Sequence, residues 1–305
     1  MIESLTLFVL AVAVAFRVKK SWRKPAWWAT AFGLLSVSTY GLFMAPPAVL
    51  DALIGGQNAL TLVRDAAAVA AMWFFHNAVA AQRDYQSRRL PWWGLCLAIA
   101  SFAVPFALIH EPGPTSQSFV LDRLDQFPVW LFSTVYTALM GTLAGRTIAM
   151  LASRRTVPTK LWVTGLSLML VSDVLEVGYL AIAHFGDVGA EFRERFYYVA
   201  QLPFFSGVII AVAGFIWIIV TLSFWWVIAR WTLHIDSQVK GPMFLQLREQ
   251  AVAKGKWTNR QVALDSAADI RDRVKLGHQR LTAVERLIFT VVERMLSNQL
   301  KKARA

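Results

Sequence analysis

The chain has 305 residues, of which 56% are hydrophobic and only 16% are charged. Soluble domains carry about 25% charged residues, so this composition is typical of a protein embedded in a bilayer. The formal net charge of +12 is concentrated in segments expected to face the cytosol, where anionic lipid accounts for it, and this excludes nucleic acid as the expected partner.

Seven apolar segments follow one another along the chain, each long enough for a tilted or upright helix to cross a hydrocarbon core of about 30 Å. Proline marks three of the starts, because its missing N–H has no intrahelical partner at the first helical position. The predicted fold is therefore an all-α seven-transmembrane bundle. The expected spans are Ile2 to Val18, Pro25 to Ala45, Ala59 to Ala81, Pro91 to Ile109, Pro128 to Leu151, Leu161 to His184 and Phe204 to Ile228.

The loops between these segments alternate in charge. Arg17 to Lys24 carries five basic residues and no acid, Arg83 to Arg89 three basic and one acidic, and Arg154 to Lys160 three basic and none. Because Lys and Arg accumulate in cytosolic loops, these loops are expected inside and the net acidic ones outside. The prediction is a multi-pass protein of the bacterial plasma membrane, with its N-terminus outside and its C-terminus inside.

Small residues predict where helices approach one another closely. Gly141 and Gly145 form a small-xxx-small face in the fifth span, and alanines between Ala66 and Ala71 leave the third span nearly smooth. Such faces serve packing within one bundle or dimerisation, and we favour packing within the bundle.

Four charged residues lie inside the predicted spans. Arg64 and Asp65 are in the third span, while Asp173 and Glu176 share one face of the sixth. An ionised side chain at such depth costs about 2.5 to 3.5 kcal/mol on insertion scales, so each needs a partner or water. Matched depths predict an Arg64–Glu176 ion pair, with Asp65 requiring another partner. The cluster is either a buried staple that sets helix register or a proton- or ligand-responsive site, and both interpretations stay open.

The sequence contains no pattern of residues that is typical of a catalytic site or a metal site. Cys96 is the only cysteine, which excludes a disulfide framework and a thiolate zinc site. The five histidines are isolated from one another, and no Ser or Cys has a readable base beside it. We expect neither an enzyme nor a protein with a metal or cofactor.

From Trp231 the composition becomes polar, with fourteen basic and seven acidic residues to the C-terminus. This predicts two domains, a membrane domain over residues 1–230 and a cytosolic helical tail over residues 231–305. Pro242 is expected to start one tail helix, and Thr258 or Asn259 to cap a second. A third helix would carry an apolar stripe that packs on the tail itself or binds a cytosolic protein or a second protomer. This stripe includes Val284, Ile288, Val291 and Met295.

Two motifs resemble an actinobacterial family of seven-span integral membrane proteins that are labelled as transporters. One is the run Pro46-Pro47-Ala48-Val49-Leu50-Asp51-Ala52-Leu53-Ile54-Gly55-Gly56-Gln57-Asn58-Ala59-Leu60, and the other is Ile270-Arg271-Asp272 in the tail. The family label implies transport, whereas frequent proximity of its genes to helix-turn-helix regulators implies signalling. After Asp272 the chain departs from the family, with Arg273-Val274-Lys275-Leu276 in place of the usual residues.

These observations together favour a sensor or regulator that couples the intramembrane cluster to the tail. The alternative is a proton-coupled transporter of an unknown small solute. Two features argue against it, namely the lack of a readable repeat between the first three and last three spans and the lack of interrupted helices.

Overall fold

The computed structural model describes residues 11, 22–40, 46–82, 89–113, 115–116, 118–153, 156–186, 189–253, 257–276, 282, 286 and 290. Every regular element among them is an α-helix, so the predicted all-α class is confirmed. The chain divides into two compact units, residues 1–215 and 216–305. The domain boundary predicted at Trp231 stays a prediction.

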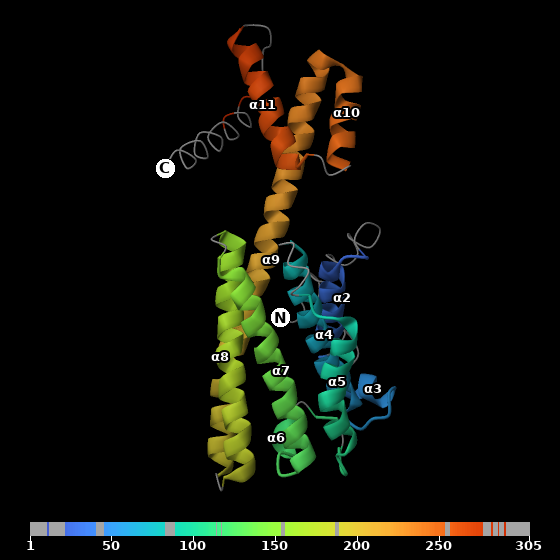
Figure 1. Ribbon diagram of the computed structural model, residues 1–305, viewed down its shortest axis with the longest axis vertical. Helices are drawn as coiled ribbons and strands as arrows, with labels where there is room; N and C mark the ends of the chain where they lie inside the picture. The colour runs from blue at the N-terminus through green and yellow to red at the C-terminus, as the bar shows by residue number, and fades with distance from the viewer. Residues whose placement is uncertain are drawn as a thin grey trace. The chain divides into compact units, whose positions relative to one another are not determined.

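The first unit is a bundle of helices that alternate in direction (Figure 1). Short α3 and α6 lie at the end of this unit where α9 begins. The helices are α2 (Pro25–Ser38), α3 (Pro47–Ala52), α4 (Ala59–Gln82), α5 (Trp92–Ala107), α6 (Phe119–Asp122), α7 (Phe127–Leu151), α8 (Val157–Phe185) and the first part of α9 (Ala190–Lys240).

Three of the described helices are long and apolar enough to cross a membrane, which indicates a membrane protein. They are α7, α8 and the stretch Arg195–Ser237 of α9, while α5 is apolar but shorter. The starts of α2 and α4 agree with the predicted spans. The first predicted span, Ile2 to Val18, lies outside the described residues apart from Ala11.

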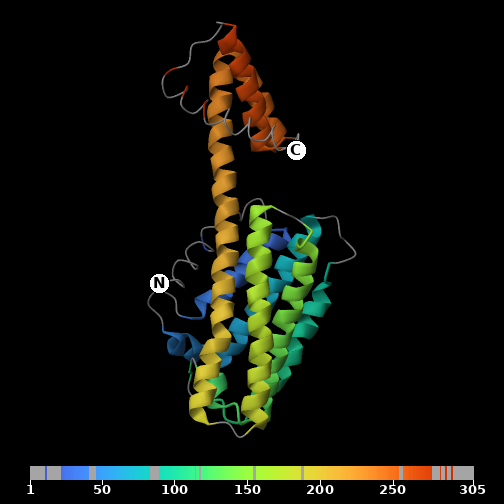
Figure 2. The ribbon, with the colours of Figure 1, turned by 90° about the vertical axis from the view of Figure 1, so that its left-hand side faces the viewer.

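Glycines allow α7, α8 and α9 to pack closely, with α8 between the other two (Figure 2). A Cβ atom added at Gly141 would lie 3.3 Å from the Cβ of Asp173, so the predicted close approach of α7 within the bundle is confirmed. Between α8 and α9 the backbones themselves meet. A Cβ at Gly165 would lie 2.6 Å from the carbonyl oxygen of Gly207, a contact that was not predicted.

The second unit contains the C-terminal part of α9, α10 (Pro242–Ala253) and α11 (Asn259–Lys275). As predicted, Pro242 begins a helix, and Thr258 caps the next in a reciprocal capping box with Gln261. Apolar residues of α9 and α11 form the core, with α10 packed against it. Its buried members are Ile228, Ala229, Leu233, Val262, Ala263 and Ala267.

A buried carboxylate joins two helices of this unit. Asp236 of α9 is fully buried and pairs with Arg273 of α11 and with Lys240, whose Nζ lies 3.3 Å from Oδ2. Ile270 is also fully buried, whereas Arg271 and Asp272 form an exposed pair. The predicted apolar stripe that includes Val284, Ile288, Val291 and Met295 lies outside the described residues.

Candidate functional site

The four predicted site residues lie in the first unit, on two helices. Arg64 and Asp65 are in the second turn of α4, and Asp173 and Glu176 lie on α8. Asp65 and Asp173 are buried, while Arg64 and Glu176 are half-buried. The structure therefore buries the two aspartates and leaves Arg64 and Glu176 partly accessible.

The prediction that Arg64 pairs with Glu176 is wrong, because Arg64 pairs with Asp65. The Nε–H of Arg64 donates to Oδ1 of its neighbour Asp65 at 2.9 Å. Consecutive Cα–Cβ bonds on a helix diverge by about 100°, but the long arginine side chain folds back across that angle. Glu176 still interacts electrostatically with both Arg64 and Asp65, so α4 and α8 bring their charges together as expected.

Asp173 lies against the glycine face of α7. Its Oδ2 atom would be 3.4 Å from a Cβ atom at Gly141. Thr137 is four residues before Gly141, so its hydroxyl shares that face of α7. The α8 acid therefore lies close to a polar strip of α7.

Three tyrosines that sequence reasoning missed also belong to this cluster. Tyr136 of α7 interacts electrostatically with Arg64, Asp65 and Glu176, and Tyr197 of α9 interacts with Glu176. The ring of Tyr40 lies 5.3 Å from the guanidinium carbon of Arg64, in cation–π range. For Tyr40 and Tyr136, a phenolic group inside a predicted apolar span was the available signal, since a buried Tyr OH usually finds a polar partner. Tyr197 precedes the seventh predicted span, so this signal did not apply to it.

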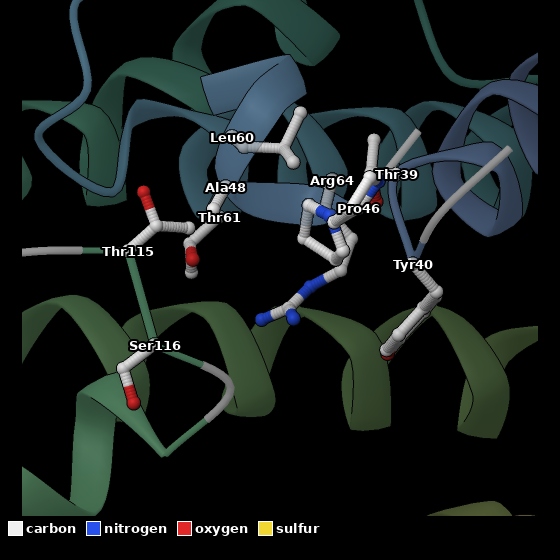
Figure 3. A pocket seen from close by; sticks show the side chains of 10 residues that line it. Thr39, Tyr40, Pro46, Ala48, Leu60, Thr61, Arg64, Thr115 and Ser116 are labelled. Atoms are coloured by element: carbon white, nitrogen blue, oxygen red, sulfur yellow. The ribbon is translucent and has the colours of Figure 1, made fainter. Parts of the chain in front are cut away.

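Arg64 also borders a cavity of about 190 Å³ at one end of the unit. Figure 3 shows its guanidinium projecting into the space between Tyr40 and the loop that contains Thr115 and Ser116. The remaining lining residues are Thr39, Pro46, Pro47, Ala48, Leu60 and Thr61.

Asp51 organises the wall of this cavity. Its carboxylate is fully buried and accepts hydrogen bonds from the backbone N–H of Asn58 at 2.8 Å, the N–H of Leu60 at 2.6 Å and the hydroxyl of Thr115 at 2.6 Å. The bond from Leu60 satisfies an N–H of the first turn of α4, where N–H groups have no partner within the helix. A carboxylate of α3 thus positions the helix that carries Arg64.

Asn58 completes the wall from the other side. It adopts a φ of 58°, a left-handed conformation that Asn tolerates better than most residues. Its amide group donates to the carbonyl of Pro112 at 2.8 Å and accepts from the N–H of Ser116 at 3.0 Å. Both Asp51 and Asn58 belong to the Pro46–Leu60 motif, so this motif builds the loop structure around the cavity.

The charged cluster and the cavity beside Arg64 can bind and stabilise a charged group. Among the residues that the structure describes, no group of three or more His, Cys, Asp or Glu is arranged to hold a metal ion.

Comparisons with protein-family models, with curated proteins and with solved structures found no match to this chain.

Proposed function

We propose that this protein is a plasma-membrane sensor or regulator, in which the intramembrane cluster controls the state of the C-terminal tail. The single observation that carries the proposal is the convergence of Arg64, Asp65 and Glu176 from α4 and α8 inside an apolar helical unit. Groups of this kind are costly in a membrane and commonly mark functional sites. A change in charge or occupancy there alters the balance between helix arrangements.

The proposed topology has seven crossings, with the N-terminus outside and the C-terminus inside. Its support is the alternating loop charge together with the alternating directions of the described helices. In this orientation the cavity beside Arg64 opens toward the outside. The tail then faces the cytosol, close to anionic lipid.

Helix α9 provides the connection that the proposal requires. It contributes residues to both compact units and runs as one helix from Ala190 to Lys240. Tyr197 of the same helix interacts electrostatically with Glu176. This proximity of Tyr197 to Glu176 supports the proposal that a change at the cluster acts on α9.

Hydrogen–deuterium exchange of the full-length protein in lipid nanodiscs tests this coupling. Glu176→Gln removes one charge from the cluster, and we expect changed exchange in residues 242–276. Glu191→Gln is the matched control, because Glu191 is exposed and pairs only with exposed Arg195 among the described residues. If the tail of Glu176→Gln exchanges like that of the parent, the proposed coupling is refuted.

The output of the tail is proposed to be binding of a cytosolic protein or of a second protomer. The apolar stripe near Ile288 and Val291 motivates this proposal, since so short a tail builds only a small core. Replacing both residues with Asp places charge on the contact surface and should abolish the association. Unchanged oligomeric state and unchanged co-purifying proteins would instead identify a self-contained cap.

Proton-coupled transport is the second candidate, and one observation favours it. The hydroxyls of Ser133 and Thr137 on α7 are buried and have no hydrogen-bond partner among the described residues. They lie on the helix face that meets Asp173, where water could hydrogen-bond to them. Proteoliposomes that acidify through the parent but not through Asp173→Asn would support transport over sensing.

A further inference from the structure

The cavity beside Arg64 has the chemistry of a site for a small anion. Arginine carries five N–H donors in a planar fork, and Asp65 engages only the Nε–H. Among the described residues no hydrogen-bond partner lies at Nη1 or Nη2. These two nitrogens form the edge of the guanidinium that pairs bidentately with carboxylates.

The surroundings hold that edge in place. Asp65 fixes the guanidinium from one side, and the Tyr40 ring lies 5.3 Å from its central carbon. An arginine fixed in this way loses less side-chain entropy on binding than a mobile one. Figure 3 shows the fork directed into the cavity, toward the hydroxyl-bearing loop.

Charge and volume together define the ligand. Asp65 pairs with the single cation and Glu176 adds further negative charge nearby, so a dianion would add more negative charge than the site can neutralise at this depth. The volume of about 190 Å³ is below the range of about 300 to 1,000 Å³ of sites for drug-sized ligands. The ligand is therefore small and carries one negative charge.

The walls indicate what the rest of the ligand is. Pro46, Pro47, Ala48 and Leu60 supply apolar surface, and Thr61 and Ser116 add hydroxyl groups to the lining. We propose that this cavity binds a short-chain monocarboxylate, with the carboxylate on Nη1 and Nη2 of Arg64 and the alkyl chain against the proline wall. This inference rests on the proposed function, because it names the signal that the sensor reads from the outer face.

Equilibrium binding of radiolabelled propionate to the full-length protein in nanodiscs tests the site. We expect saturable binding to the parent that phosphate and propylamine do not compete. Competition by phosphate at lower concentration than propionate would overturn the monocarboxylate assignment. Competition by propylamine would overturn it in favour of a cation held by the neighbouring acids.

Two variants test the charge and the volume of the site separately. Arg64→Lys replaces the fork with a point charge and should weaken propionate binding about tenfold or more. Ala48→Phe keeps every charge but fills the cavity, so it should also abolish binding. The matched control is Arg146→Lys, which changes an exposed arginine of α7 and should bind like the parent. Parent-like binding by Ala48→Phe would place propionate elsewhere and refute the site.

Propionate binding and hydrogen–deuterium exchange of the tail test the site and the proposed coupling independently. If propionate binds but leaves exchange in residues 242–276 unchanged, the site stands and the sensing function fails. If propionate does not bind while Glu176→Gln alters tail exchange, the coupling stands and the monocarboxylate site fails.

Discussion

The side chains of Arg64 and Asp65, consecutive residues of α4, form an ion pair in which Nε donates to Oδ1 at 2.9 Å. The two charges thus compensate one another within a single helix. This pairing reduces the cost of placing α4 in an apolar environment. It also leaves the outer edge of the guanidinium directed into the cavity.

Breaking this pair should be strongly destabilising. Arg64→Ala leaves the buried carboxylate of Asp65 without its partner, and we expect a loss of about 3 to 5 kcal/mol in the free energy of unfolding. The double variant Arg64→Ala/Asp65→Ala should lose less, because neither charge then stays buried alone. Reversible unfolding in mixed detergent measures both values.

The exposed pair of Arg195 and Glu191 is the matched control for that measurement. Glu191→Gln should change stability by less than about 1 kcal/mol, as is usual for exposed pairs. If Arg64→Ala costs no more than this control, water or lipid headgroups already solvate Asp65.

Asp51 should be essential for the structure of the cavity wall. Asp51→Ala leaves three donors without an acceptor, those of Asn58, Leu60 and Thr115, so we expect a loss of about 3 kcal/mol or more. Amide exchange at Leu60 should accelerate at the same time. Thermal unfolding and exchange of the purified protein provide the two readouts.

Asp122→Ala removes a carboxylate that also accepts two hydrogen bonds, but at exposed sites. It should cost less than about 1 kcal/mol, because water replaces the lost acceptor. Equal losses for the two variants would show that burial of the Asp51 carboxylate is not what matters.

The α8–α9 contact should tolerate no side chain at Gly165. In Gly165→Ala the new Cβ would lie 2.6 Å from a backbone oxygen, so the helices must separate, at a cost of about 1 to 3 kcal/mol. Gly178→Ala on the same helix has no atom within 4 Å and should be neutral or stabilising by up to about 1 kcal/mol. The unfolding midpoint of Gly165→Ala should therefore fall, while that of Gly178→Ala should stay unchanged or rise, and a parent-like midpoint for Gly165→Ala would contradict the close contact.

Several elements could be predicted because their signals are local. Pro25 and Pro242 begin helices, since proline fixes φ and lacks an N–H. The fifth predicted span, from Pro128 to Leu151, agrees with α7 to within one residue. Its Gly141 face is visible because two small residues four apart share one side of a helix.

Other features could not be predicted because they depend on two helices at once. Gly165 has no small residue four positions away on α8, and the Gly207–Ala211 spacing on α9 marks a small-residue face without identifying the helix that it meets. The partner of Arg64 depends on a side-chain conformation that sequence depth does not determine. The length of α9 was missed because polar residues after Ile228 resemble a loop, although no Gly or Pro occurs between Gly214 and Gly241 to end the helix.

The proposed orientation predicts which loops are accessible from outside intact cells. In a Cys96→Ala background, Asp125→Cys should react with an impermeant thiol reagent, whereas Ser153→Cys should react only after permeabilisation. Both positions are exposed, so accessibility reports the side of the membrane and not burial. Labelling of position 153 but not 125 in intact cells would invert the topology.

The stability of the tail unit should depend on the ion pair between buried Asp236 and Arg273. Asp236 is fully buried and Arg273 is partly buried, at 16% side-chain exposure, so Asp236→Ala leaves a guanidinium with limited access to water beside α9. We expect a loss of about 3 to 5 kcal/mol in the stability of this unit. The measurement is proteolysis of residues 242–276 in the full-length protein.

Asp272→Ala is the matched control for the tail, because it removes an exposed carboxylate one residue away from Arg273. It should leave protease resistance unchanged. Replacing both members of the buried pair, in Asp236→Leu/Arg273→Met, should restore much of the resistance, since apolar residues of similar volume remove the unpaired charge. If Asp236→Ala digests like Asp272→Ala, water solvates the remaining cations, and the Asp236–Arg273 pair does not hold α11 against α9.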